Sequence, residues 1–221
     1  MPRYQGMIFD MDGVLSRTDR LHYLAWVRFT EQHGLPFSEE INRRMLGRSR
    51  EECMDIVLGK AAGRMSAEEK LSLIREKNEL FLAYARNLTE RDCAPGVLRT
   101  LKALRARGVR LALGSSSQNA PVVIKKLGLP AYLDVLVDGT EIEHKKPAPD
   151  IFLTAAERLG LPAGQCLVVD DAEAGVEAAL RGGFDIAGIG PAAEDERCTY
   201  RLEVFSDLMD IVLPEETDGD H

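Results

Sequence analysis

The sequence lacks any apolar run that approaches the roughly 20 residues needed to cross a membrane. Its first apolar stretch, after Met1, is short and soon turns acidic, which is unlike a secretory signal. The four cysteines, Cys53, Cys93, Cys166 and Cys198, are far apart and form no Cys-x-x-Cys pair. Neither a cysteine-based metal site nor a disulfide framework is therefore predicted, and reduced thiols favour a cytoplasmic protein.

Positive charge is in the minority, with 28 Lys and Arg against 36 Asp and Glu and a net charge of -8. Such a surface repels nucleic-acid backbones and anionic lipid, so neither nucleic acid nor a membrane is expected as a partner. Any anionic ligand must then meet a local positive site. Hydrophobic residues make up 45% of the 221 residues, enough to fill a core, which excludes a disordered chain.

Short apolar runs alternate with helical patterns over most of the chain. Strands are predicted at 4–9, 109–113, 135–137, 166–169 and 186–189. A helix is predicted before the second strand, at 97–107, and one between each later pair of strands, at 121–127, 150–159 and 174–181. This alternation predicts an α/β fold, a doubly wound (Rossmann-like) parallel sheet covered on both faces.

A separate helical region interrupts this pattern after the first strand. Ser49 with Glu52, and Ser66 with Glu69, have the capping-box spacing that begins a helix, and no strand pattern is present nearby. We predict an inserted α-helical cap. The predicted boundaries are 1–16 plus 93–213 for the α/β core, 17–92 for the cap and 214–221 for an acidic C-terminal tail without an assigned role.

Polar residues follow the predicted strands at their carboxyl ends, where open parallel sheets bind ligands. They are Asp10 and Asp12, Ser115 to Ser117, Lys146 in the loop after the third strand, and Asp170 with Asp171. Each acidic pair alone could simply end a strand or begin a helix. Their convergence on one edge of the sheet, together with a lysine and three hydroxyls, favours an active site.

The residue types at this edge suggest their chemistry. Asp10 and Asp12 are two residues apart, so on an extended backbone they point to the same side. Clustered carboxylates repel one another unless a cation lies between them, and Mg²⁺ is the oxygen-seeking ion that best fits carboxylates plus phosphate. Hydroxyls and free amides before a helix can hold a phosphate. Pro147 and Pro149 restrain the backbone around Lys146 and fix the direction of its side chain.

These residues resemble, in order and spacing, the four signature motifs of the haloacid dehalogenase (HAD) superfamily of phosphotransferases. The resemblance runs from about residue 5 to about residue 212. It implies that Asp10 attacks phosphorus to form an aspartyl-phosphate, and that Asp12 acts as general acid and then as general base. It further implies that Ser115 and Lys146 hold the phosphoryl oxygens. The implied magnesium ligands are Asp10, Asp170, Asp171 and the backbone carbonyl of Asp12.

A second set of residues is similar to the β-phosphoglucomutase subfamily. Its members are Thr18, His22, Trp26, Gly47, Arg50, Lys77, Ser116, Ser117 and Asn119. The similarity implies that Arg50, Ser117 and Asn119 bind the non-reacting phosphate of a hexose bisphosphate. It implies that His22 couples cap closure to proton handling by Asp12, and that Trp26 and Lys77 line the sugar site. The implied partner is a small phosphorylated sugar. A monomer is the simplest expectation, since movement of the cap needs no partner subunit.

The implied reaction interconverts β-glucose 1-phosphate and glucose 6-phosphate through a hexose bisphosphate. Three residues depart from the subfamily pattern: Arg17 replaces an acid in the linker to the cap, Asp170 replaces a Glu, and Gln118 replaces a Lys. A phosphatase that acts on a sugar phosphate or another small phosphomonoester is therefore the alternative.

Two other classes of protein fit the sequence less well. A signalling receiver domain has no use for a long helical insertion or for an acid two residues after the phosphorylated one. A nicotinamide dehydrogenase requires a Gly-x-Gly-x-x-Gly turn after the first strand, where this chain has Asp-Met-Asp-Gly.

Overall fold

The computed structural model describes residues 3–45 and 48–212. The chain divides into two compact units, one of Met1–Arg17 with Thr89–His221 and one of Thr18–Leu88. The predicted cap, 17–92, begins one residue before the second unit and ends four residues after it. The predicted tail at 214–221 lies outside the described residues.

The first unit contains a parallel sheet of six strands within the described residues, in the order β3-β2-β1-β4-β5-β6. The strands are β1 (Gly6–Phe9), β2 (Arg110–Gly114), β3 (Val135–Val137), β4 (Cys166–Asp170), β5 (Asp185–Ile189) and β6 (Tyr200–Leu202). The predicted doubly wound α/β fold is confirmed, as are the five predicted strands. The sixth strand is missing from the prediction because Tyr-Arg-Leu is too short and too polar to give a strand pattern.

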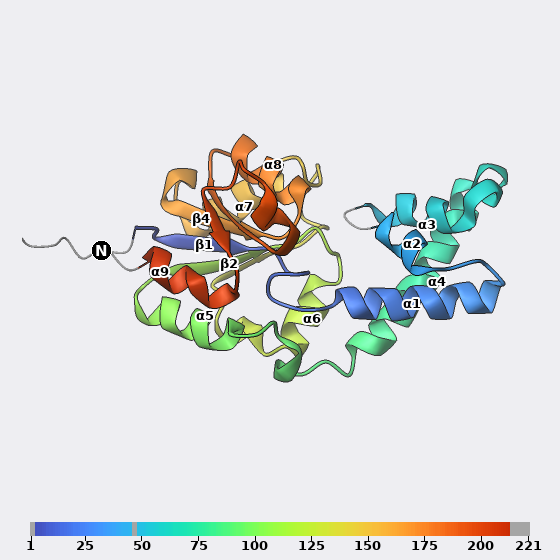
Figure 1. Cartoon of the computed structure of the whole chain (residues 1–221), viewed down its shortest axis with the longest axis horizontal. Coiled ribbons are helices and arrows are strands. Elements are labelled where there is room, and N and C mark those ends of the chain that lie inside the picture. Colours follow the sequence, from blue (N-terminus) through green and yellow to red (C-terminus); the bar gives the residue numbers. More distant parts are fainter. Residues whose placement is uncertain (1–2, 46–47, 213–221) are drawn as a thin grey trace, which may run out of the picture. The chain divides into compact units, whose positions relative to one another are not determined.

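Helices cover both faces of this sheet. They are α5 (Val97–Ala106), α6 (Ala120–Lys126), α7 (Asp150–Leu159), α8 (Glu173–Arg181) and α9 (Leu208–Val212). Figure 1 shows α7 and α8 on one side of the sheet and α5 and α9 on the other. The central strands are buried along their whole length, β1 and β4 without an exposed residue, because both of their faces meet helices. Phe152 of α7, for example, packs in one cluster with Ile8 and Val168.

The second unit is built of helices and contains no strand among its described residues. Its helices are α1 (Asp19–His33), α2 (Glu39–Arg43), α3 (Arg50–Leu58) and α4 (Ala67–Ala85). Both predicted capping boxes are confirmed: the Ser49 amide donates to Glu52 at 2.9 Å and the Ser66 amide donates to Glu69 at 2.7 Å, with the reciprocal bonds present. Within the described ranges, no helix is long and apolar enough to cross a membrane.

Candidate active site

The two central strands bring the first acidic residues side by side. Asp10 directly follows β1 and Asp170 ends β4, and these strands pair in parallel with Phe9 opposite Val169. The Asp10 amide donates to the Val169 carbonyl at 2.9 Å, which continues the ladder and fixes the direction of the chain at Asp10. The predicted convergence of acids at the carboxyl edge therefore follows from the register of β1 and β4.

Lys146 lies between these two carboxylates. Its ammonium donates to Asp10 Oδ1 at 2.5 Å and to Asp170 Oδ2 at 2.7 Å, and the lysine side chain is only 10% exposed. The ammonium also lies 4.6 Å from the centroid of the Phe152 ring, which adds a cation–π contact. The sequence motifs give the three residues but not this geometry, in which one lysine joins both acidic motifs.

The cluster carries more negative charge than one lysine can neutralise. Burial raises the pKa of Asp10 to about 8, and the charges of Asp170 and Asp12 add to this effect against the opposing effect of Lys146. The pKa of Asp171 is raised to about 7 by burial and by Asp170. Burial alone would lower the pKa of Lys146, but the carboxylates of Asp10 and Asp170 raise it above its ordinary value. The site therefore favours an additional cation.

The donor set fits Mg²⁺. Carboxylate oxygens of Asp10, Asp170 and Asp171, with the carbonyl of Asp12, are the hard ligands that this ion prefers. Within residues 3–45 and 48–212, no three acidic, imidazole or thiol side chains already surround a common point. The ammonium of Lys146 instead bridges two of the carboxylates.

Two glycines allow the acidic side chains to lie against the backbone. A Cβ at Gly13, where φ is 83°, would lie 2.0 Å from Asp171 Oδ2. A Cβ at Gly175 in α8 would lie 1.9 Å from the carboxyl carbon of Asp170. Sequence reasoning missed Gly175, although an isolated glycine in a helical pattern is a signal of close packing.

Replacing Gly175 by Ala is expected to destabilise the protein. Alanine normally stabilises a helix interior by about 1 kcal/mol relative to glycine. Here the new methyl group would displace the Asp170 carboxylate from its bonds to Lys146 and to the Ala172 amide, and overpacking of this kind costs about 1–3 kcal/mol. Urea unfolding measures the difference. Gly164→Ala, which meets no atom within 4 Å, is the control, and a more stable Gly175→Ala protein would contradict the interpretation.

The serine loop begins beside the acidic cluster. Leu113 of β2 is level with Phe9 of β1, so Gly114, which ends β2, lies level with Asp10, which follows β1. Ser115 comes next and is only 1% exposed. Ser115 Oγ accepts from the Ser117 amide at 3.2 Å, and Ser117 Oγ accepts from the Asn119 amide at 3.2 Å. Ser116 Oγ is buried and has no hydrogen-bond partner among the described residues. A buried hydroxyl of this kind is costly unless a ligand atom satisfies it.

In the helical unit, three of the predicted substrate residues come together. The Lys77 ammonium lies 3.0 Å from His22 Nδ1 and 4.8 Å from the centroid of the Trp26 ring. Because an ammonium only donates, Nδ1 accepts and Nε2 carries the imidazole proton. The His22 ring also stacks on Phe81 at 4.1 Å. Burial lowers the pKa of His22 well below its ordinary value, with further contributions from Lys77 and Arg50, so His22 is neutral at pH 7.

The remaining predicted residues have separate places. Thr18 is the buried N-cap of α1, and Arg50 is the first residue of α3. Asn119 is the N-cap of α6 and is 5% exposed. Gly47 lies outside the described residues.

The raised carboxyl pKa values predict that the metal-free protein loses stability as the pH rises from 6.5 to about 8. In this range folded Asp10 and Asp171 still bind protons that the unfolded chain has released, so the free energy of unfolding falls with rising pH. The pKa of His22 is 6.5 in the unfolded chain and lower in the folded protein, so its opposing effect on stability lies mainly below this range. Urea unfolding in EDTA checks this, and Asp10→Asn should flatten the profile. A stability that rises with pH over this range would contradict the charge assignment.

The chain is also similar to known proteins in sequence and in fold. The family described as haloacid dehalogenase-like hydrolase matches residues 4–183. The β-phosphoglucomutase of Bacillus subtilis (strain 168) is 37% identical over 214 residues, which cover 96% of this chain and 95% of the relative. The phosphorylated carbohydrates phosphatase of Thermotoga maritima is 31% identical over 216 residues, which cover 96% of this chain and 95% of that protein. The crystal structure of β-phosphoglucomutase from Clostridium difficile superposes with a TM-score of 0.84 at 28% identity, covering 93% of each chain.

Proposed function

Because this chain belongs to the haloacid dehalogenase-like hydrolase family, we propose that it transfers the phosphoryl group of a sugar phosphate through a covalent intermediate on Asp10. The observation that carries the proposal is the buried cluster in which Lys146 joins Asp10 to Asp170. Positioning and charge neutralisation are what phosphoryl transfer requires most from a protein.

In the first step, a carboxylate oxygen of Asp10 attacks phosphorus while the bond from phosphorus to the sugar oxygen breaks. Asp12 donates a proton to the departing oxygen and becomes a carboxylate. In the second step, Asp12 takes the proton of an acceptor hydroxyl, whose oxygen attacks the same phosphorus and frees Asp10. Both residues thus return to their starting states, as a catalyst requires.

Other residues of the first unit would hold the transferring group. The Lys146 ammonium and the Ser115 hydroxyl are proposed to bind the phosphoryl oxygens, and the buried hydroxyl of Ser116 is a further donor. Asp10, Asp170 and Asp171, with the Asp12 carbonyl, are proposed to hold Mg²⁺, which when bound would neutralise charge on the carboxylates and on the phosphoryl oxygens.

We propose a sugar hydroxyl rather than water as the acceptor. Phosphorylated Asp10 would give its phosphoryl group to a hydroxyl of β-glucose 1-phosphate or glucose 6-phosphate, and the hexose bisphosphate so formed would return its other phosphate to Asp10, which interconverts the two monophosphates. The 37% identical relative, which is named β-phosphoglucomutase, supports the assignment. The cluster of His22, Trp26 and Lys77 supports a sugar phosphate as the substrate of a mutase or a phosphatase alike, because it combines a neutral imidazole, an aromatic ring and an ammonium. Thr18, Gly47 and Arg50 of this unit, and Ser117 and Asn119 of the serine loop, are proposed as further substrate contacts.

A phosphatase is the second candidate, because a relative at 31% identity is named as one. Phosphorus NMR separates the two. The protein is mixed with Mg²⁺, β-glucose 1-phosphate and a trace of β-glucose 1,6-bisphosphate, with Asp10→Asn as the blank. Glucose 6-phosphate without matching inorganic phosphate would support the mutase. Inorganic phosphate in proportion to the substrate consumed would instead identify a phosphatase.

A further inference from the structure

The loop after β5 packs against the turn that carries Asp171. This loop forms a short 3-10 helix, η5 (Gly190–Glu194), in which Ala192 is only 2% exposed. The Ala192 amide donates to the Asp171 carbonyl at 3.0 Å. The carbonyl of Ala192 lies so close to β5 that a Cβ at Gly188 would be 2.3 Å from it. The backbone carbonyl of Asp171 is therefore positioned by a hydrogen bond from η5.

Arg197 stabilises the end of this loop through an ion pair with Asp195. Its Nε donates to Asp195 Oδ1 at 3.0 Å and its Nη2 donates to Asp195 Oδ2 at 2.7 Å, a two-point contact that sets the orientation of both side chains. The Asp195 amide donates to the Ala192 carbonyl at 3.1 Å, and Cys198 Sγ donates to the same carbonyl at 3.3 Å. Arg197 thus fixes the segment that presents Ala192 to Asp171.

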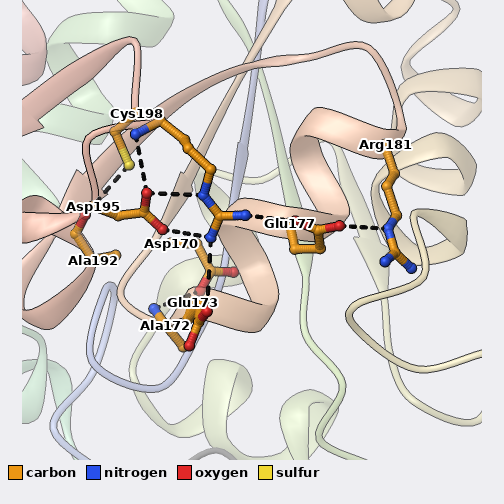
Figure 2. A network of polar contacts seen from close by, with 9 residues as sticks. Asp170, Ala172, Glu173, Glu177, Arg181, Ala192, Asp195 and Cys198 are labelled. Carbon is orange, nitrogen blue, oxygen red and sulfur yellow. Dashed lines mark hydrogen bonds and ion pairs between the residues drawn. The ribbon is translucent and has the colours of Figure 1, made fainter.

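The same guanidinium reaches helix α8. Its Nη1 donates to Glu177 Oε2 at 2.6 Å, and its Nη2 lies 3.9 Å from Glu173 Oε1. Figure 2 shows Asp195 to the left of the guanidinium, Glu177 of α8 to its right, and Glu173 of α8 below it. Just before α8, the Ala172 amide donates to Asp170 Oδ1 at 3.0 Å. Helix α8 therefore continues from the turn that orients Asp170.

We infer that Arg197 is a positioning residue for the acidic turn: it joins the loop that holds the Asp171 backbone to the helix that follows the Asp170 carboxylate. Its guanidinium donates to Asp195 and Glu177, so it acts on Asp170 and Asp171 through the backbone and not by direct contact. The inference rests on the proposed function in one respect, that Asp170 and Asp171 bind Mg²⁺.

If Arg197 served only the stability of the fold, its loss would lower the free energy of unfolding and leave Mg²⁺ affinity unchanged. Arg197 is 42% exposed, and ion pairs at exposed positions change global stability little. Loss of the guanidinium should instead loosen the placement of two proposed metal ligands, which weakens metal binding. Groups that directly contact metal ligands change affinity by about 10–100-fold. Arg197 acts on Asp171 through Asp195 and Ala192, two contacts further away, so a smaller change of about threefold to tenfold is expected.

The test is a calorimetric titration of metal-free protein with Mg²⁺ alone, which does not depend on turnover. Arg197→Ala should bind Mg²⁺ about threefold to tenfold more weakly than the unsubstituted protein, with nearly the same urea midpoint in EDTA. Arg181→Ala is the matched control, because Arg181 donates to the same Glu177 at 2.7 Å from α8 itself and does not reach the loop. It should bind within about twofold of the unsubstituted protein.

Asp195→Asn gives an independent measurement that keeps the shape of the side chain and removes the charge that orients Arg197; it should weaken Mg²⁺ binding in the same direction. Unchanged affinity in both Arg197→Ala and Asp195→Asn would overturn the inference, and so would equal weakening by Arg181→Ala. If the unsubstituted protein bound no Mg²⁺, the magnesium part of the proposed function would fail as well. If only the inference about Arg197 were wrong, the unsubstituted protein would still bind Mg²⁺ and the variants would bind it equally well.

Discussion

Replacement of Asp10 by Asn is expected to lower the turnover of β-glucose 1-phosphate by at least about 10⁴-fold, the scale on which loss of a catalytic nucleophile acts. An amide has nearly the size of the carboxylate but lacks its nucleophilic charge. The raised pKa of Asp10 means that negative charge is unfavourable at this buried position, so a neutral side chain should leave the fold intact. Lys146 keeps its bond to Asp170.

Steady-state kinetics and urea unfolding check the two halves of this prediction. Asp210→Asn is the matched control, since Asp210 is an exposed residue of α9. It should leave both turnover and the urea midpoint unchanged. A folded Asp10→Asn protein that keeps more than about one hundredth of the activity would remove Asp10 from the role of nucleophile.

Replacement of Lys146 by Ala has the second largest expected effect, and it acts on both stability and activity. Removing one partner of a buried ion pair typically costs about 3–5 kcal/mol, because the other charge stays buried without compensation. Here the carboxylates of Asp10 and Asp170 would face each other without the ammonium. The cost should be greater at pH 8 than at pH 6.5, because protonation of Asp10 relieves the repulsion at the lower pH.

The activity of Lys146→Ala should fall by about 10²–10³-fold even with excess Mg²⁺, since one charged donor to the phosphoryl oxygens is lost. Lys145→Ala is the control: Lys145 is the exposed neighbour in the same loop, and its removal should change neither quantity. Full activity in Lys146→Ala would show that the lysine serves only the resting structure.

Much of the fold follows from the pattern of the sequence. Buried strands of a parallel sheet read as short apolar runs, and β1 and β4 give this signal strongly because both of their faces are covered. Capping boxes mark the starts of α3 and α4 because their bonds are local. The edge strand β6 gives no such signal, since its pairing with β5 depends on the surrounding fold.

The site divides in the same way. The motifs identify Asp10, Lys146 and Asp170 because each lies at the carboxyl end of a strand or in a restrained loop. Their bonds join residues 136 and 24 positions apart in the chain, and no sequence periodicity reports such contacts. The bond between Lys77 and His22 likewise spans 55 positions. The role inferred for Arg197 depends wholly on tertiary contacts and has no motif.

The most direct test of the central claim is to trap the phosphorylated residue. The protein is mixed with Mg²⁺ and β-glucose 1,6-bisphosphate, quenched in acid, reduced with borohydride and mapped by peptide mass spectrometry, with Asp10→Asn treated in parallel. We expect a reduced acyl-phosphate at residue 10 alone, and none in the Asp10→Asn protein. A trapped acyl-phosphate on another residue, or turnover that persists in Asp10→Asn, would contradict the proposal that Asp10 is the nucleophile.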